Sequence, residues 1–153
     1  MWSRFWRLSG FERGLVMESA AILIATWAGL RLLGFRRWKR FLGWLSPAKR
    51  GAEGVAGSDQ VSLARVVARR EESAARHLFY QPNCLEQSLT LWWLLRLRSI
   101  PSEIRIGGRK SEDRFEAHAW VECGGEVLSS GGEGHLHFVP FDEPIPNWET
   151  SAH

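Results

Sequence analysis

An apolar helix predicted over residues 84–98 constrains the fold of this chain more than any other stretch. Its start is well marked, because Asn83 is a favourable N-cap residue and Glu86 stands three residues later, where a capping-box glutamate belongs. Leucine and tryptophan then occupy nearly every side of the helix: Leu89, Leu91, Trp92, Trp93, Leu94, Leu95 and Leu97. A helix that is apolar all round must be covered all round, so we expect it at the buried centre of a domain.

The helix start places Cys84 at the first helical position. Free backbone N–H groups and the positive end of the helix dipole favour a thiolate there, and the thiolate is the nucleophilic form of cysteine. Cys84 is therefore a candidate nucleophile. The alternative is a small buried hydrophobe, which is the usual role of a free cysteine.

The size of the chain, 153 residues, suits one hydrophobic core, and we expect one domain with an N-terminal appendage. The two cysteines are too few for a disulfide framework. We expect reduced thiols in a cytoplasmic protein, with a bridge between Cys84 and Cys123 as the alternative.

Positive charge is concentrated at the N-terminal end. Residues 1–50 contain ten Lys/Arg and two Asp/Glu, a net charge of +8, whereas residues 51–153 contain ten and fifteen, a net charge of −5. The basic end suits an acidic peptide, a partner protein or an anionic membrane surface. No nucleic-acid-binding motif accompanies it, so we expect no nucleic-acid partner.

The N-terminal region, residues 1–45, has apolar residues at helical spacing from residue 10 onward, which predicts one or two helices. Only twelve uncharged residues separate Glu18 from Arg31, whereas a membrane span needs about 20. Residues 36–41 mix cations and aromatics, as interfacial helices do. We interpret the region as a soluble docking helix, with peripheral membrane contact and a true span as alternatives.

A linker is predicted over residues 46–57, which contain Pro47 and three glycines. The domain itself is then expected over residues 58–153. Its first helix is expected to be capped by Asp59 and to end near Leu78. The charged residues of this helix are assigned to its solvent face: Arg65, Arg69, Arg70, Glu71 and Glu72.

Strands follow the central helix. Alternating residues predict them over 102–107, 115–123 and 126–130, with a last short strand over 135–139. A polar loop is predicted over 107–114, and a two-residue hairpin turn at Gly124 and Gly125. Helices followed by antiparallel strands predict an α+β fold, with a buried helix packed on a small antiparallel sheet.

His118, in the second predicted strand, is the candidate general base. A thiol peptidase or acyl-transferase needs an activated cysteine, a histidine within hydrogen-bond reach and a group that orients the imidazole. Cys84 and His118 supply the first two if the strand packs across the helix N-terminus. The alternative is a half-buried histidine without a catalytic role.

Three motifs carry a resemblance: NCLEQSL at residues 83–89, RSIPSEIRIG at 98–107 and AHAWVE at 117–122. In this order and spacing they resemble the lasso-peptide biosynthesis B proteins of the stand-alone leader-peptidase type, which are similar to the C-terminal domain of the microcin-processing B protein. The resemblance covers roughly residues 60–140. It implies a transglutaminase-like (papain-like) cysteine peptidase fold, with Cys84 as nucleophile and His118 as base.

The resemblance also implies the reaction and its partners. One peptide bond of a ribosomally made lasso precursor would be hydrolysed, which releases the core from its leader. A small leader-binding (PqqD-like) protein would present the precursor, and a separate cyclase would close the ring. No cofactor is evident in the sequence, and ATP dependence enters by family resemblance only. A zinc site built from the cysteines and histidines, including His135 and His137, lacks the Cys-x-x-Cys spacing.

The chain departs from the family at the third catalytic position. The family has an aspartate twelve residues after the histidine, where this chain has Ser130. In an ideal hairpin His118 faces Gly131, and a one-residue bulge would bring Ser130 to the imidazole instead. A serine hydroxyl accepts a hydrogen bond but does not stabilise an imidazolium as a carboxylate does. Glu133 and Asp142 are possible substitutes.

Two groups could donate a hydrogen bond to the oxyanion. Gln81 stands three residues before the thiol, and the backbone N–H of Cys84 is the other candidate.

Two further functions compete with leader cleavage. One is a catalytically weak or inactive peptide-binding scaffold in the same maturation complex, and the other is a thiol acyl-transferase.

Overall fold

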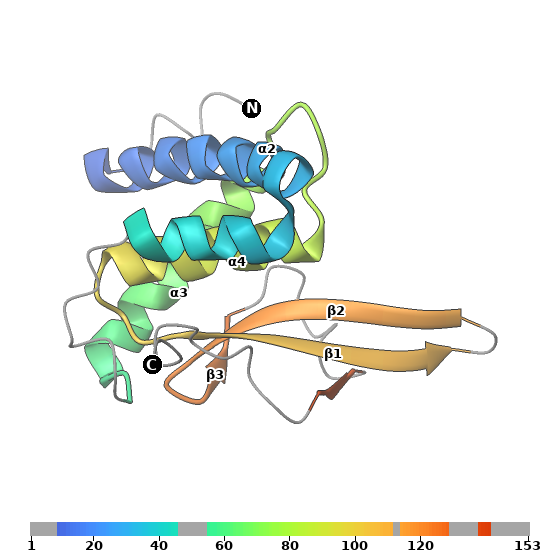
Figure 1. Cartoon of the computed structure of the whole chain (residues 1–153). Helices are drawn as coiled ribbons and strands as arrows, with labels where there is room; N and C mark the ends of the chain where they lie inside the picture. Colours follow the sequence, from blue (N-terminus) through green and yellow to red (C-terminus); the bar gives the residue numbers. More distant parts are fainter. Residues whose placement is uncertain (1–8, 46–54, 112–113, 129–137, 142–153) are drawn as a thin grey trace.

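Three helices precede a small antiparallel sheet, as the sequence predicts (Figure 1). The computed structural model describes residues 9–45, 55–111, 114–128 and 138–141. The helices are α2 (Gly10–Leu45), α3 (Ser58–Ala75) and α4 (Cys84–Leu97). The strands are β1 (Glu103–Ser111), β2 (Arg114–Cys123), β3 (Glu126–Val127) and β4 (Val139–Pro140), in the spatial order β3-β2-β1-β4.

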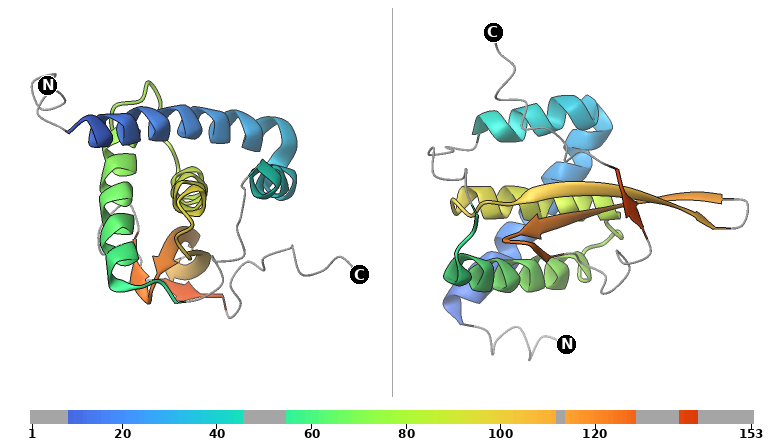
Figure 2. Two further views of the ribbon diagram at one scale, coloured as in Figure 1. Left: turned by 90° about the vertical axis from the view of Figure 1, so that its left-hand side faces the viewer. Right: turned by 90° about the horizontal axis from the view of Figure 1, so that it is seen from below.

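Helix α4 is the centre of the molecule, which confirms the prediction from its composition. It contacts α2, α3, β1 and β2. Figure 2 shows it nearly end-on, with helices on three sides and the sheet on the fourth. The side chains that face these neighbours are buried: Leu89, Leu91, Trp92, Leu94 and Leu95. Because every side of α4 is covered, the helix needs no polar face.

The long helix α2 is broken at Gly34, whose φ of 74° and ψ of 167° are not helical. The part after the break turns back toward the part before it. The Trp38 ring lies so close to Gly29 that a Cβ there would stand 2.2 Å from it. Lys39 is buried beside α4, with its Nζ 5.8 Å from the centroid of the Trp92 ring, and burial lowers the pKa of Lys39 to about 8. The prediction of one or two helices is thus confirmed as two helical segments that flank α4.

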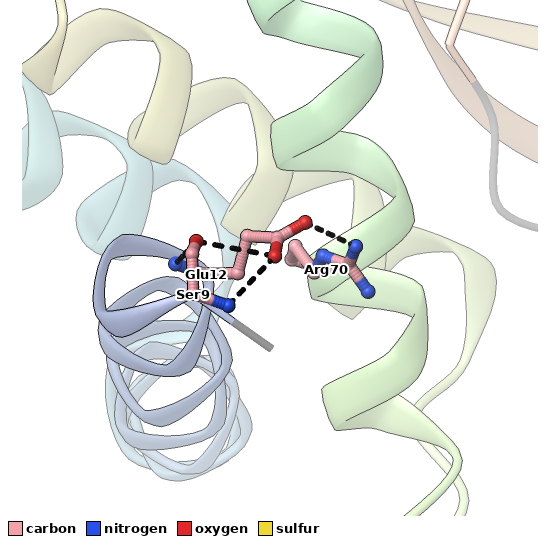
Figure 3. Close-up of polar contacts among 3 residues, drawn as sticks. All are labelled: Ser9, Glu12 and Arg70. Carbon is pink, nitrogen blue, oxygen red and sulfur yellow. Dashed lines mark hydrogen bonds and ion pairs between the residues drawn. The ribbon is translucent and has the colours of Figure 1, made fainter. Parts of the chain in front are cut away.

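A polar clamp joins the start of α2 to α3 (Figure 3). The backbone N–H of Ser9 donates to Glu12 Oε2 at 3.0 Å, and the N–H of Glu12 donates to Ser9 Oγ at 3.2 Å. The other carboxylate oxygen of Glu12 accepts from Arg70 of α3. The hydrogen bond from the Ser9 backbone, together with the Arg70 guanidinium, lowers the pKa of Glu12. One glutamate therefore caps α2 and ties it to α3.

The predicted bounds of α3 are wrong at both ends. Its N-cap is Gly57 rather than Asp59, because the Gly57 N–H donates to Gln60 Oε1 at 3.1 Å and the Gly57 carbonyl accepts from Val61 N at 2.9 Å. The helix ends at Ala75, three residues before the expected Leu78.

The assignment of Glu71 to the solvent face is also wrong, because its side chain is fully buried. Glu71 follows the buried Val67 by four residues and precedes the buried Ala74 by three, so helical spacing puts it on the apolar stripe. Neither carboxylate oxygen has a hydrogen-bond partner within the described ranges. Burial, together with the charge of Glu72, raises the pKa of Glu71 to about 8.

The polar loop predicted over 107–114 is wrong, because β1 runs through Ser111 and β2 begins at Arg114. The two strands pair continuously from Glu103 opposite Glu122 to Ser111 opposite Arg114. Gly107 is required inside the strand rather than in a loop. A Cβ there would lie 2.8 Å from the Trp120 ring and 2.7 Å from the carbonyl oxygen of Val139.

The predicted glycine turn is confirmed. Gly124 and Gly125 have φ values of 58° and 79°, and Cys123 pairs with Glu126 across them. The ladder continues to the hydrogen bond from Leu128 N to the Val121 carbonyl, 2.8 Å long. The strand predicted over 126–130 is described as Glu126–Val127, and residues 129–130 lie outside the described ranges.

The last strand lies later than predicted. It is Val139–Pro140, which pairs with Gly108 and Gly107 of β1, and residues 135–137 lie outside the described ranges.

By length and composition alone, helix α2 is long and apolar enough to cross a membrane. A buried helix in the core of a soluble protein can meet the same two criteria. In this structure its first part packs inward through Leu15, Ile22 and Leu23, all of which are buried. The predicted linker over 46–57 lies outside the described ranges except for its last residues, where Ala56 is buried.

Candidate active site

Cys84 is the first residue of α4 and is half-buried, so its thiol is not sealed in the core. The predicted capping box forms in full. Glu86 N–H donates to Asn83 Oδ1 at 2.9 Å, and Asn83 N–H donates to Glu86 Oε2 at 3.0 Å. Helix geometry leaves the N–H groups of Cys84 and Leu85 without intrahelical acceptors. The thiol therefore lies beside backbone N–H groups that can donate hydrogen bonds to a negatively charged oxygen of a substrate.

The segment before Cys84 is held by polar contacts on both sides. Tyr80 OH donates to the carbonyl of Leu23 in α2 at 3.0 Å, and Gln87 Nε2 of α4 donates to the Pro82 carbonyl at 2.8 Å. Gln81, the predicted oxyanion donor, lies between these anchors and is exposed. Its position near the helix start suits that role, which stays a prediction.

His118 lies in the middle of β2 and is half-buried between two aromatic rings. Its ring is stacked on Trp120, with centroids 6.2 Å apart, and lies against Phe138, with centroids 5.2 Å apart. Trp120 is itself fixed, because its Nε1 donates to Glu122 Oε1 at 2.9 Å. The imidazole is thus held by β2 and by the segment that leads into β4.

The two aromatic partners of His118 differ in whether the sequence alone could predict them. Trp120 stands two residues after His118, and strand alternation puts both on one face. Phe138 is twenty residues away and reaches the imidazole only through the pairing of β4 with β1. No local pattern marks that contact.

The two elements that carry the predicted dyad pack on each other, since α4 contacts β2. In Figures 1 and 2 the N-terminal end of α4 points toward the free end of the β1–β2 hairpin, which projects beyond the helices. Val121 and Cys123 enter the core shared with α4, so alternation gives His118 the other strand face. The approach of the imidazole to the thiol thus depends on how the twisted hairpin bends around the helix end. The Cys84–His118 pair stays a prediction.

The three candidates for the third catalytic position, Ser130, Glu133 and Asp142, lie outside the described residues. The hairpin is regular as far as Leu128, so the bulge that would carry Ser130 to His118 is absent from the described part of the ladder. Their roles stay predictions.

The second cysteine differs from the first. Cys123 is buried, and burial, together with the nearby charge of Glu126, raises the pKa of its thiol. Both cysteines are free thiols, so the alternative of a bridge between them is not present. Within the described ranges, no group of three or more His, Cys, Asp or Glu side chains could hold a metal ion.

Comparison with known proteins identifies the family. Residues 29–141 match the model of the transglutaminase-like superfamily. This match covers well over half of the chain, and the protein belongs to that superfamily. The transglutaminase-like α+β fold expected from the sequence is confirmed. The superfamily includes cysteine peptidases and transglutaminases, so thiol-based hydrolysis and acyl transfer are both compatible with the domain. No curated protein and no solved structure matches the chain.

Proposed function

We propose that this protein is a cysteine peptidase that removes the leader from a ribosomally made lasso-peptide precursor. The observation that carries the proposal is the half-buried thiol of Cys84 at the first position of a capped, buried helix in a transglutaminase-like domain. A small leader-binding (PqqD-like) protein would present the precursor, and a cyclase would receive the released core. The three sequence motifs around Cys84, Ile100 and His118 support this choice of substrate.

The proposed chemistry requires the imidazole of His118 to lie within hydrogen-bond reach of Cys84 Sγ. Cys84 Sγ attacks the carbonyl carbon of the scissile bond while its proton passes to the imidazole of His118. The backbone N–H of Cys84 and the side chain of Gln81 donate to the oxyanion. The C–N bond then breaks, and His118 gives its proton to the leaving amine. Water, deprotonated by His118, attacks the thioester, so that a carboxylate leaves and the thiol is restored.

The aromatic clamp supports the role of His118. Stacking against Trp120 and Phe138 restricts the plane of the imidazole, which a carboxylate does in many related sites. Ser130 would accept a hydrogen bond from the second ring nitrogen, with Glu133 or Asp142 as substitutes. A neutral orienting group gives a slower enzyme than a carboxylate would.

Cleavage of a precursor tests the proposal. The full chain is incubated with the precursor encoded beside its gene, with and without the leader-binding partner, and the products are identified by mass spectrometry. We expect one cut between leader and core for the wild-type protein and none for Cys84→Ala. Cys123→Ala is the matched control, since it removes the other thiol, and it should still cut. Cleavage by Cys84→Ala would contradict the proposal.

The same assay separates the alternatives. An added amine that becomes attached to the carboxyl end of the leader, which is the acyl group held on Cys84, would indicate acyl transfer rather than hydrolysis. A protein that binds precursor and partner, does not cut, and shows no preferential alkylation of Cys84 over Cys123 would be the scaffold. The serine at position 130 is the feature that favours this last alternative.

A further inference from the structure

The part of α2 after Gly34 presents an exposed face that no described part of the protein covers. Trp38 and Leu42 point inward and are buried. On the other side, Arg37, Arg40, Phe41 and Trp44 follow one another at the spacing of a single helix face, and all four are exposed. The Phe41 and Trp44 side chains are 42% and 78% exposed, and their rings lie 6.4 Å apart.

Two further apolar side chains of α2 are exposed. Leu45, at the end of the same segment, is 42% exposed, and Leu32, before the break at Gly34, is 82% exposed. Contact of apolar side chains with water is unfavourable, so the exposed Phe41, Trp44 and Leu45 together mark an interaction site.

The charge around the face has one sign. No Asp or Glu occurs between Glu18 and Glu53, while seven Lys/Arg lie in that interval. Within the described part of the chain, Arg36, Arg37 and Arg40 form no ion pair. The natural partner of this face is therefore anionic as well as able to accept apolar side chains.

We propose that this face of α2, formed by Arg37, Arg40, Phe41 and Trp44, binds the surface of an anionic phospholipid bilayer. The helix would lie in the plane of the headgroups, with the arginines against lipid phosphates and the aromatic rings at the acyl boundary. Tryptophan favours that depth because it is apolar with a single polar N–H. The inference goes beyond the proposed peptidase activity.

The orientation of the rest of the protein agrees with this placement. Trp38 and Lys39, on the inward side of the same segment, contact Gly29 and Trp92. The catalytic domain thus lies on the side of the helix that faces away from the bilayer. The uncharged stretch before Arg31 is twelve residues, about 18 Å of helix, and a bilayer core is about 30 Å thick. The inward side of this stretch packs in the protein core, so binding at the bilayer surface fits better than a membrane span.

Vesicle flotation of the full chain tests the proposal. We expect binding to vesicles of phosphatidylcholine with about 30% phosphatidylglycerol, weaker binding to pure phosphatidylcholine, and release in high salt. Arg37→Gln with Arg40→Gln should lower the partition coefficient by roughly thirtyfold, at about fivefold per arginine. Arg37→Lys with Arg40→Lys keeps the charge and should bind nearly as the wild type does.

Removal of the rings should also weaken binding, so Phe41→Ser with Trp44→Ser is the second test variant. The matched control is Arg69→Gln, Arg76→Gln and Phe79→Ser, which removes two exposed arginines and one exposed aromatic ring elsewhere. It should bind vesicles as the wild type does.

Four outcomes would overturn the proposal. The first is equal binding to anionic and neutral vesicles, and the second is an equal loss of vesicle binding in the control and the test variants. The third is retention in the membrane after alkaline carbonate extraction, which would indicate a span. The fourth is a protein that does not bind vesicles but forms a concentration-dependent dimer that Trp44→Ser abolishes.

Discussion

Glu71 makes the stability of this protein depend on pH in a direction that is unusual for a glutamate. Its side chain is fully buried in α3, and neither carboxylate oxygen has a hydrogen-bond partner within the described residues. Burial, together with the charge of Glu72, raises its pKa from 4.5 to about 8. The folded protein therefore holds this carboxyl neutral at pH 7, where the unfolded chain has it ionised.

The size of the pH-dependent change in unfolding free energy follows from the folded and unfolded pKa values of Glu71. Because the folded value is the higher one, the stabilising contribution is fully present below pH 4.5 and is lost as the pH rises through about 8. At 1.36 kcal/mol per pH unit, the whole interval corresponds to about 5 kcal/mol of unfolding free energy. Between pH 5.5 and pH 8.5 the loss is about 3 kcal/mol. This is a large part of the stability of a typical domain.

The substitution Glu71→Met removes the carboxyl and keeps a side chain of similar length. An apolar group in this environment no longer has to be desolvated as an anion, so the variant should be more stable than the wild type at pH 8.5. Urea unfolding at pH 5.5, 7.0 and 8.5 measures both proteins. We expect the stability of the wild type to fall by about 3 kcal/mol relative to the variant over this range.

The neighbouring Glu72→Gln is the control, since Glu72 is half-buried and pairs with Arg76 on the helix surface. It should retain most of the wild-type pH dependence. Parallel curves of unfolding free energy against pH for wild type and Glu71→Met would contradict the prediction, because they would mean that Glu71 is ionised and solvated in the folded protein.

Three further predictions concern the helices. Asn83→Ala should lower stability by about 1 kcal/mol through loss of the cap of α4, measured by urea unfolding; an unchanged midpoint would contradict the capping role. Gly29→Leu should disrupt the packing of Trp38 and lower the melting temperature, since even a Cβ there lies 2.2 Å from the ring; a stable variant with unchanged tryptophan fluorescence would contradict this contact. Glu12→Gln should destabilise the protein more at pH 7 than at acidic pH, because a carboxyl with a lowered pKa stabilises the folded state above pH 4.5 and loses that contribution as the pH falls through its folded value; equal effects at neutral and strongly acidic pH would argue against the clamp with Arg70.

The centre of the fold was readable from the sequence because its signals are local. Asn83 and Glu86 specify the start of α4 within four residues, and both capping hydrogen bonds form. Gly124 and Gly125 likewise specify their turn through the positive φ values that glycine tolerates. In both places the residues that determine the structure are adjacent in the chain.

One error arose because a local spacing was overlooked, and the others arose where contacts distant in sequence decide the structure. Glu71 was assigned by its chemical type, although its spacing from Val67 put it on the buried stripe. Gly107 was assigned to a loop, because nothing nearby shows that the Trp120 ring needs the space. Phe138 could not be connected to His118 without knowing that β4 pairs with β1.

The proposed reaction depends on activation of the Cys84 thiol by His118. Alkylation with iodoacetamide at pH 6, followed by peptide mass spectrometry, measures this activation, with the buried Cys123 as the internal comparison. We predict that Cys84 is modified at least about tenfold faster than Cys123, and that His118→Ala removes most of this advantage. Equal rates for the two thiols, or a Cys84 rate that His118→Ala leaves unchanged, would contradict it.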